Sequence, residues 1–441
     1  MTILSTKVER YAKILPFAPT SSKQVMAYCK SKGYSIPKNR KTGNPTVDNA
    51  ALEKILRKNP TDSVLPLVLA CRDLQKADGY LSDAYMGKDG RFHPEIAQDT
   101  ETLRFNSRRP NIMNQMKPEK FKGTSDPRKL AKMVIAEEII GSIEASPGMI
   151  LIERDYKAQE SLLLGFFADD PNYMRMARLG IYSYFLSKKF NKEVDLSQPD
   201  EVVKKALSNI KAEFPFEYPI MKKTILARGY GEGVPAIAKD LEPYFVDAAK
   251  GAALEEARKK AYWTKALEEN PFLDARVVGM VFNFAYSLAK QAAQEYVEVY
   301  EKAAPKVVAF QHSIREKAHK ERKLVNPYGY PRYFYDVFTK RNGKWVLGSE
   351  ANKALAFLPQ STGASILKEC MLALDERNDP DLYMLIPEHD KLVCECPIEK
   401  ANYYLQIMKD VMEAPIKELN GLVIETEGKK GLNWGAMEDA L

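Results

Sequence analysis

Two aspartates lie where short apolar segments end. Asp155 follows MILIER, residues 149–154, and Asp390 lies at the centre of LIPEHDKLVCE, residues 385–395, whose alternating pattern predicts a hairpin. A single aspartate at such a position is usually a turn residue or a helix cap. If the two segments are neighbouring strands, however, the carboxylates converge, and their mutual repulsion favours divalent cations between them. Carboxylate oxygens completed by substrate phosphates are the ligands that suit Mg²⁺.

A lysine and a tyrosine lie between these aspartates in the segment KKTILARGYGEG, residues 222–233. Lys222 and Tyr230 are eight residues apart, close to two helical turns, so on a helix they face the same way. A solvated lysine beside a packed tyrosine satisfies this spacing. A clamp in which the lysine neutralises a triphosphate and the tyrosine offers a flat ring to a base satisfies it equally. The spacing does not choose between these two interpretations.

The order of the predicted elements indicates which parts of the chain position these residues. Residues 1–85 are mostly helical, with Thr46 or Asp48 as a cap, and residues 86–175 mix strands with helices. Long amphipathic helices fill residues 176–325, and strands return after residue 326, with an Asn-Gly hairpin turn in RNGK, residues 341–344. An amphipathic helix is predicted over 398–417. This order suggests one α+β domain interrupted by a helical insertion.

Composition narrows the class of protein. The 441 residues are 45% hydrophobic and 28% charged, an ordinary globular balance that excludes a wholly disordered or collagen-like chain. No apolar run approaches the ~18 residues of a membrane span and the N-terminus lacks a signal peptide, so we expect a soluble, intracellular protein. Five scattered cysteines and four histidines do not favour disulfides or structural zinc, so any metal must be held by carboxylates. The net charge of +7, with basic clusters at 38–41, 104–109, 222–223 and 315–323, is a weak signal for phosphate-rich partners.

Three motifs in order resemble the polymerase module of family A DNA polymerases. The first is DYKAQE at 155–160, the second is Lys222 followed eight positions on by Tyr230-Gly231, and the third is His389-Asp390. Weaker blocks that also resemble the family lie around them in the correct order, namely TLRFNSRRPNIMNQ at 102–115, VNPYGYPRYFYDV at 325–337, PQSTGASILK at 359–368 and LNWGAMEDAL at 432–441. Residues 41–56 resemble the thumb, so the likeness spans nearly the whole chain.

The resemblance implies an α+β right-hand polymerase fold with an antiparallel-sheet palm and a helical thumb and fingers. It assigns residues 1–85 to the thumb, 86–175 and 326–441 to the palm, and 176–325 to the fingers. Family members often carry a proofreading exonuclease before the thumb. We therefore expect either a truncated chain or a stand-alone polymerase module, as in a viral enzyme, whose exonuclease is absent or on another chain.

The resemblance also implies a metal site and a nucleotide site. Asp155, Asp390 and the backbone carbonyl of Tyr156 hold two Mg²⁺ ions, for which Mn²⁺ can substitute. Lys222 neutralises the triphosphate and Tyr230 stacks near the templating base. The remaining implied nucleotide-binding residues are Glu160 and Leu226, and the implied primer–template contacts are Arg104, Asn111, Asn114, Gln360 and His389.

Four positions depart from the family pattern. Tyr218 replaces a usual arginine, Leu226 a usual aromatic residue, Lys391 a common acidic residue and Ala356 an expected asparagine. These departures bear on substrate affinity and fidelity, while both metal carboxylates are retained.

The function implied is a template-directed DNA polymerase, a nucleotidyltransferase of DNA replication or repair that adds deoxynucleotides to a primer 3′ end. The alternatives are an RNA polymerase or primase of the same fold, for which Glu160 discriminates, and a catalytically inactive polymerase-like DNA-binding subunit. The expected partners are primer–template DNA, dNTPs and a separate exonuclease or processivity factor, with no membrane. The expected location is the bacterial cytoplasm or nucleoid, or a phage-infected host cell.

Overall fold

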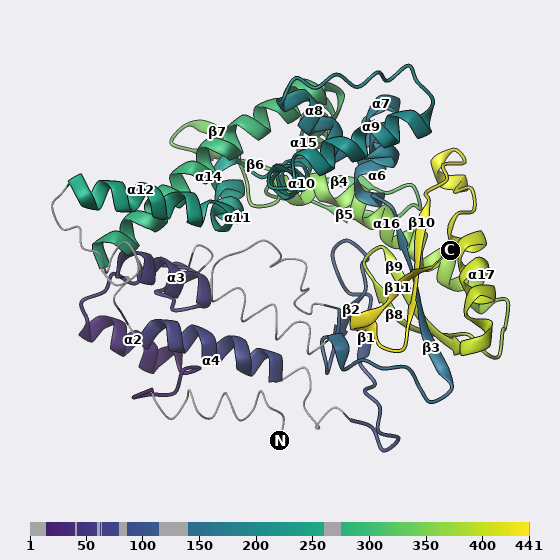
Figure 1. Cartoon of the computed structure of the whole chain (residues 1–441), viewed down its shortest axis with the longest axis horizontal. Coiled ribbons are helices and arrows are strands. Elements are labelled where there is room, and N and C mark those ends of the chain that lie inside the picture. The colour runs from purple at the N-terminus through teal and green to yellow at the C-terminus, as the bar shows by residue number, and fades with distance from the viewer. Residues whose placement is uncertain are drawn as a thin grey trace. The chain divides into compact units, whose positions relative to one another are not determined.

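The structure is a computed structural model that describes residues 15–39, 42–59, 62, 64–78, 86–113, 140–259 and 275–440. Figure 1 shows the arrangement of its helices and strands. The chain divides into two compact units. The first unit comprises Met1–Pro94, Arg109–Ile139 and Leu241–Gln291, and the second comprises Glu95–Arg108, Ile140–Asp240 and Ala292–Leu441. Helices and antiparallel sheets occur together, so the predicted α+β class is confirmed.

A five-stranded antiparallel sheet forms the centre of the second unit, in the order β11-β10-β3-β9-β8. Its strands are β3 (Met149–Tyr156), β8 (Tyr383–Glu388), β9 (Lys391–Pro397), β10 (Thr426–Gly431) and β11 (Glu438–Ala440). Three two-stranded sheets accompany it: β1 (Glu95–Ala97) with β2 (Asn106–Arg108), β4 (Lys323–Val325) with β5 (Pro331–Tyr333), and β6 (Phe338–Arg341) with β7 (Lys344–Leu347). The hairpins predicted around RNGK and around Asp390 are both present.

Helices cover one face of the large sheet. They are α16 (Ala351–Asp375) and α17 (Ala401–Met412), and Figure 1 shows α17 alongside the strands. The Tyr156 hydroxyl donates to the carbonyl of Met412 at 2.9 Å and lies 3.1 Å from Cys370 Sγ, which ties β3 to both helices. The helix predicted over 398–417 is shorter, because a 3₁₀ turn at Ile398–Lys400 precedes it and Pro415 cannot continue it.

The remaining helices of the second unit follow β3 or precede β4. They are α6 (Gln159–Phe167), α7 (Pro171–Leu179), α8 (Ile181–Lys189), α9 (Asp200–Glu213), α10 (Glu217–Gly229), α11 (Val234–Leu241) and α15 (Pro305–Glu321). The 29-residue α14 (Ala275–Ala303) is shared between the two units. Within the described residues, no helix is long and apolar enough to cross a membrane.

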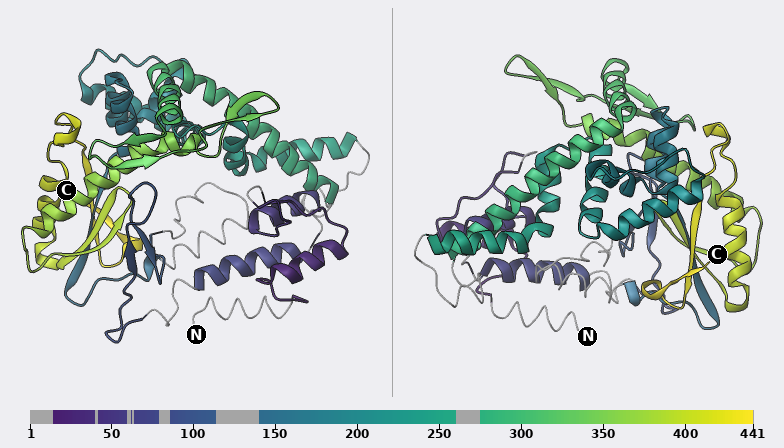
Figure 2. Two further views of the ribbon diagram at one scale, coloured as in Figure 1. Left: turned by 180° about the vertical axis from the view of Figure 1, so that it is seen from behind. Right: turned by 45° about the horizontal axis from the view of Figure 1, so that its top comes forward.

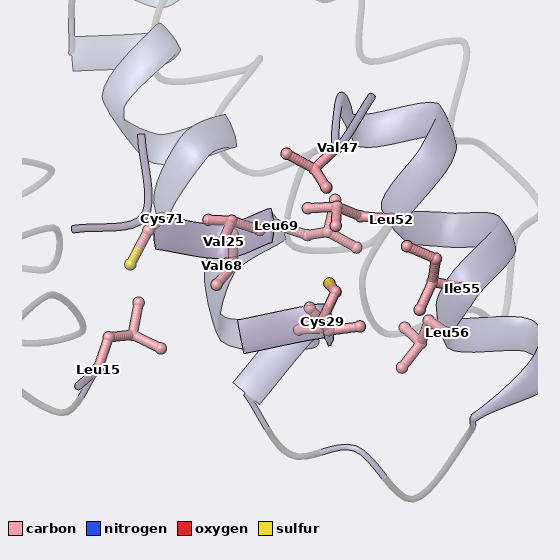
Figure 3. Close-up of a cluster of buried hydrophobic side chains, with 11 residues drawn as sticks. Leu15, Val25, Cys29, Val47, Leu52, Ile55, Leu56, Val68, Leu69 and Cys71 are labelled. Atoms are coloured by element: carbon pink, nitrogen blue, oxygen red, sulfur yellow. The ribbon is translucent and has the colours of Figure 1, made fainter. Parts of the chain in front are cut away.

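The first unit contains α2 (Ser22–Ser31), α3 (Asn49–Lys58), α4 (Val64–Asp78), the 3₁₀ turn η3 (Glu242–Phe245) and α12 (Val246–Lys259). Figure 3 shows its core around Val25 and Cys29 of α2 and Leu52 and Ile55 of α3, all at most 1% exposed. The predicted cap Asp48 accepts a hydrogen bond from the Ala51 amide at 2.8 Å.

Candidate active site

The two predicted metal carboxylates come from neighbouring strands. Asp155 lies near the end of β3, opposite Lys391 of β9 in the strand register, and Asp390 immediately precedes Lys391. The Tyr156 amide donates to the Asp390 carbonyl at 3.1 Å, so the β8–β9 turn is fastened to the end of β3. Both aspartates are half-buried. The structure therefore brings Asp155 and Asp390 together, as the sequence led us to expect.

The turn that presents Asp390 contains a backbone conformation that residues other than glycine rarely adopt. His389 has a φ of +57°, in the left-handed region, and lies between Glu388, the last residue of β8, and Asp390. A residue with a side chain pays for this conformation unless the surroundings impose it, and such residues cluster at functional sites. The positive φ of His389 indicates that contacts with the surrounding residues impose the conformation of the His389-Asp390 turn.

Side chains alternate between the two faces of β3. Arg154 points away from the carboxylates and is fully buried, donating to the Leu405 carbonyl at 3.1 Å and to Thr426 Oγ1 at 2.8 Å. Burial lowers the pKa of Arg154, and the Glu413 carboxylate opposes that shift. These contacts hold β3 from the helical side, which leaves Glu153 and Asp155 on the opposite face.

Lys391 forms an ion cluster on that face. Its Nζ lies 2.7 Å from Glu153 Oε2 and 3.3 Å from Glu388 Oε2, and both glutamates are almost fully buried. Trp434 Nε1 donates to Glu153 Oε2 at 2.9 Å, and the ammonium is 5.0 Å from the centroid of the Trp434 ring. Burial opposes the charge on Lys391, but Glu153, Glu388 and then Asp155 outweigh it, so the pKa of Lys391 is raised. The sequence motifs had shown Lys391 only as a departure and had given Glu153 and Glu388 no role.

A second cluster surrounds Glu160 in the first turn of α6. Arg104 donates to Glu160 Oε1 in an ion pair whose side chains are about three-quarters buried. The Tyr230 hydroxyl is buried, and burial raises its pKa well above the usual value. The Glu160 carboxylate raises that pKa further, while Arg104 and the side chain of Gln360 in α16 lower it. The hydroxyl makes no hydrogen bond of good geometry, yet it is close enough to Glu160, Arg104 and Gln360 for each of them to affect its pKa.

Lys222 lies exposed on α10, and its Nζ is 5.7 Å from the centroid of the Tyr182 ring on α8. The Tyr182 and Tyr218 rings meet edge to face with centroids 5.9 Å apart. Burial raises the pKa of Tyr182; Tyr218 adds to the shift, a hydrogen bond with Ser161 opposes it, and Glu160 and Asp390 raise it further. Tyr182 therefore lies beside Lys222 and within the electrostatic influence of Glu160 and Asp390. Nothing in the sequence pattern singles it out.

Lys222 and Tyr230 are expected to lie on one helix, but α10 ends just before Tyr230. The helix stops at Gly229, and Tyr230 is its C-cap, with its amide bonded to the Ala227 carbonyl at 3.2 Å. Gly231 follows with a φ of +78°, and a Cβ there would lie 2.6 Å from Leu355 Cδ1. The turn thus requires glycine after Tyr230. Leu226, one turn before Tyr230, is half-buried in the helix.

Two predicted primer–template residues are not among the described residues of the second unit. Asn111 is described but belongs to the first unit, and Asn114 lies outside the described residues. The others, Arg104, Gln360 and His389, are in the second unit with the carboxylates.

The donor set fits a hard divalent cation. Across the ranges that the structure describes, no three His, Cys, Asp or Glu residues gather as a metal cage. Mg²⁺ does not require such a cage, because it commonly binds one or two carboxylates and completes its shell with water and substrate phosphates. Asp155 and Asp390, half-buried and on adjacent strands, meet that requirement.

Comparison with known proteins agrees with this geometry. Residues 280–436 match the family model "DNA polymerase family A", a range that includes Gln360 and His389-Asp390. The chain is 24% identical to DNA polymerase I of Deinococcus radiodurans over 98% of its own length and 37% of the relative's. It is 24% identical to the thermostable DNA polymerase I of Thermus aquaticus, again over 37% of the relative's length. A DNA polymerase of Mycobacterium phage D29 is 24% identical over 34% of this chain and 22% of the phage protein.

A solved structure shares the fold. It is the POL domain of Pol1 from M. smegmatis in complex with DNA primer-template and dNTP, with a TM-score of 0.64 and 18% identity over 98% of this chain and 64% of that one. The chain thus spans little more than a third of the DNA polymerase I relatives and about two-thirds of the POL domain. By sequence the chain is similar to family A DNA polymerases, and by fold it is similar to a POL domain.

Proposed function

We propose that this chain is a template-directed DNA polymerase that transfers deoxynucleotidyl groups to a primer 3′-hydroxyl. The observation that carries the proposal is the junction of β3 with the β8–β9 turn, where the Tyr156 amide binds the Asp390 carbonyl and brings Asp390 beside Asp155. A nucleotidyl transfer needs positioned divalent cations more than it needs a nucleophilic side chain, and two carboxylates on rigid strands suit that purpose.

Asp155, Asp390 and the Tyr156 carbonyl would hold two Mg²⁺ or Mn²⁺ ions. When bound, such ions lower the pKa of an attacking hydroxyl and offset charge on the triphosphate and leaving group. The chain's own contribution is placement. Tyr156 is anchored through its hydroxyl on α16 and α17, so the strand end that bears Asp155 is fixed from behind.

Lys222 supplies the positive charge for the triphosphate. Its ammonium is exposed, and the Tyr182 ring 5.7 Å away limits where it points. Tyr218, at the position where the family pattern has arginine, places a neutral phenol against the Tyr182 ring. At position 218 the triphosphate site of this chain therefore offers a hydroxyl donor rather than a cation.

Glu160 is the residue proposed to reject ribonucleotides. Its ion pair with Arg104 and its proximity to Tyr230 hold the carboxylate beside the α10 cap, with Leu226 one turn earlier. A ribose 2′-hydroxyl entering that space would collide with a fixed carboxylate and lose hydration, whereas a deoxyribose would not. Because Arg104 positions Glu160, the same arginine would influence both sugar choice and primer binding.

The domain assignment is part of the proposal. The thumb at 1–85 falls within the first unit, and the palm strands with most of the fingers helices fall within the second. Residues 241–291, assigned to the fingers, group with the first unit instead. Primer–template DNA would meet Arg104, Gln360 and His389, with Asn111 and Asn114 as further contacts from residues 109–139. A separate exonuclease or processivity factor and a cytoplasmic setting remain predictions.

Primer extension tests the assignment. The purified chain is incubated with a labelled primer–template, Mg²⁺ and either dNTPs or rNTPs. We expect extension with dNTPs, and a loss of about 10³-fold or more, equal to about 4 kcal/mol, for Asp155→Asn and Asp390→Asn. Asp439→Asn is the matched control, since it removes an exposed carboxylate from β11 of the same sheet.

The outcome separates the alternatives. Extension with rNTPs at a rate comparable to that with dNTPs would identify an RNA polymerase or primase. DNA binding without extension by either set would identify an inactive DNA-binding subunit. Near-normal turnover in Asp155→Asn would remove the metal assignment even if the chain extends primers.

Glu160→Ala tests the sugar-selection step separately. We expect the preference for dNTPs over rNTPs to shrink by about tenfold or more, equal to about 1.4 kcal/mol. Glu160→Gln, which keeps the size of the side chain but not its ion pair, should retain more of the preference. An unchanged preference in Glu160→Ala would assign the selection to another residue.

A further inference from the structure

The β6–β7 hairpin is a short ribbon with little role in the core. β6 and β7 pair from Phe338 with Leu347 to Arg341 with Lys344, and Asn342 and Gly343 close the turn with φ values of +51° and +76°. Both views in Figure 2 show the ribbon projecting from the helices of the second unit. Two-stranded hairpins are only marginally stable alone, so a projecting one needs an anchor at its base.

The hairpin is basic. Residues 337–348 include Lys340, Arg341 and Lys344 and no acidic residue, and residues 320–347 carry seven Lys and Arg against two acidic residues. The acidic groups at the base of the hairpin are engaged locally. Asp336 accepts from the Ser349 amide and hydroxyl at 2.8 and 2.7 Å, and Glu350 accepts from the Tyr335 and Asp336 amides. Hydrogen bonds from Ser349 lower the pKa of Asp336 and Arg341 lowers it further, so Asp336 offsets part of the positive charge of the hairpin.

The same segment exposes apolar rings. Trp345 is 60% exposed and Tyr335 is 74% exposed, although burial of such side chains would be favourable. Seven of the seventeen exposed large apolar residues in the described chain fall between 325 and 347, namely Val325, Tyr330, Tyr333, Tyr335, Trp345, Val346 and Leu347. Such a concentration within 23 residues indicates a surface that is covered by a partner.

Trp345 is exposed but held in place. It lies opposite Lys340 in the register, with the lysine Nζ 5.1 Å from the ring centroid. His319 of α15 meets the indole edge to face at 5.6 Å and meets Phe338 in the same way at 5.3 Å. Phe338 packs on the core between α15 and α16, which anchors the base of the hairpin. The indole is thus a pre-oriented flat surface beside a cation.

We propose that the β6–β7 hairpin is a binding platform for single-stranded nucleic acid, in which a base stacks on Trp345 and the neighbouring phosphates contact Lys340, Arg341 and Lys344. Aromatic stacking beside a basic track is how proteins hold single strands without reading their sequence. Lysines on an exposed strand also discourage edge-to-edge pairing, but that role does not account for an exposed indole. If the proposed polymerase function holds, the natural strand is the unpaired template; the platform itself does not depend on that function.

Binding of a dye-labelled oligothymidine to the full chain, followed by fluorescence anisotropy, tests the platform without catalysis. We expect Trp345→Ala to weaken binding about tenfold, and Trp345→Phe to recover most of the loss because a ring remains. The triple variant Lys340→Gln, Arg341→Gln, Lys344→Gln should flatten the dependence of log K on log salt by about two units. Tyr403→Ala, which removes a ring that is 57% exposed on α17, is the matched control and should change neither quantity.

Several results would overturn the proposal. Wild-type affinity in both Trp345→Ala and the triple variant, with unchanged thermal unfolding, would do so whatever the polymerase assay shows. Loss of self-association in Trp345→Ala with normal oligonucleotide binding would assign the hairpin to contacts between copies of this chain. Weakened oligonucleotide binding in a chain that cannot extend primers would keep the platform and remove the polymerase assignment. An oligouridine measured in parallel shows whether the platform prefers DNA or RNA.

Discussion

Lys391→Met should destabilise the second unit strongly. In the folded chain the Lys391 ammonium lies 2.7 Å from Glu153 and 3.3 Å from Glu388, in a cluster where both carboxylates are almost fully buried. Methionine keeps the length and apolar stem of the side chain but removes its charge. Two buried carboxylates then face each other without the cation that balances them.

The distances set the magnitude. At an effective dielectric constant of about 20, each contact supplies about 5–6 kcal/mol of attraction. Desolvation of the buried charges offsets more than half of this sum of about 11 kcal/mol. We therefore expect a net loss of about 3–5 kcal/mol in the free energy of unfolding, the range typical for breaking a buried ion pair. The raised pKa of Lys391, in which neighbouring carboxylates outweigh burial, agrees in direction with a net favourable pair.

Urea unfolding followed by circular dichroism measures the effect. Lys391→Arg keeps the charge and should recover part of the stability. Lys391→Met combined with Glu388→Gln should be less destabilised than Lys391→Met alone, because one of the stranded charges has been removed. A loss below about 1 kcal/mol in Lys391→Met would show that water or the Trp434 indole satisfies the glutamates, and the reasoning would then fail.

Three further outcomes are expected. Lys222→Ala should lower the rate of nucleotide incorporation with little change in primer–template affinity, measured by single-turnover extension and anisotropy; an equal loss of duplex binding would make it a backbone contact. Gly231→Ala should cost about 2 kcal/mol of unfolding free energy, because its φ of +78° and the nearby Leu355 disfavour a Cβ. Burial and the hydrogen bond to Asp62 raise the pKa of Tyr34 to about 12. Its folded pKa lies above the unfolded value near 10, so its contribution to stability should be complete below about pH 10 and fall as the pH rises toward 12, and Tyr34→Phe should reduce that fall.

Much of the site could be predicted from the sequence because its residues lie in local patterns. An apolar run that ends in Asp155 and an alternating hairpin around Asp390 place both carboxylates at strand ends, and strand pairing does the rest. The same holds for Lys222 and Tyr230, since one helix and its C-cap fix their spacing. Their approach to Glu160 and Arg104 depends on the family resemblance, because no local pattern relates residues 104, 160 and 230.

Tyr182 shows why other contacts could not be predicted. Its neighbours come from three separate segments: Tyr218 and Lys222 from α10, Glu160 from α6 and Asp390 from the β8–β9 turn. Only tertiary packing brings them near Tyr182. The pattern of apolar and polar residues around Tyr182 has no clear helical periodicity and does not single out this tyrosine. A role that depends on tertiary packing leaves no trace in such a pattern.

Lys391 is visible in the sequence as a departure from the family pattern, but its partners depend on tertiary packing. In the sequence, Lys391 stands beside Asp390 at a position where the family commonly has an acidic residue. The structure shows that two glutamates compensate the positive charge of Lys391. Glu153 lies two residues before Asp155, Glu388 lies two residues before Asp390, and both carboxylates are within 3.3 Å of the ammonium. The Lys391 ammonium binds the two buried glutamates on this face. They balance most of its positive charge, so its repulsion of a cation bound at Asp155 is reduced. A basic residue next to a two-carboxylate site is therefore compatible with metal binding here, and the Glu153–Lys391–Glu388 cluster is the physical reason.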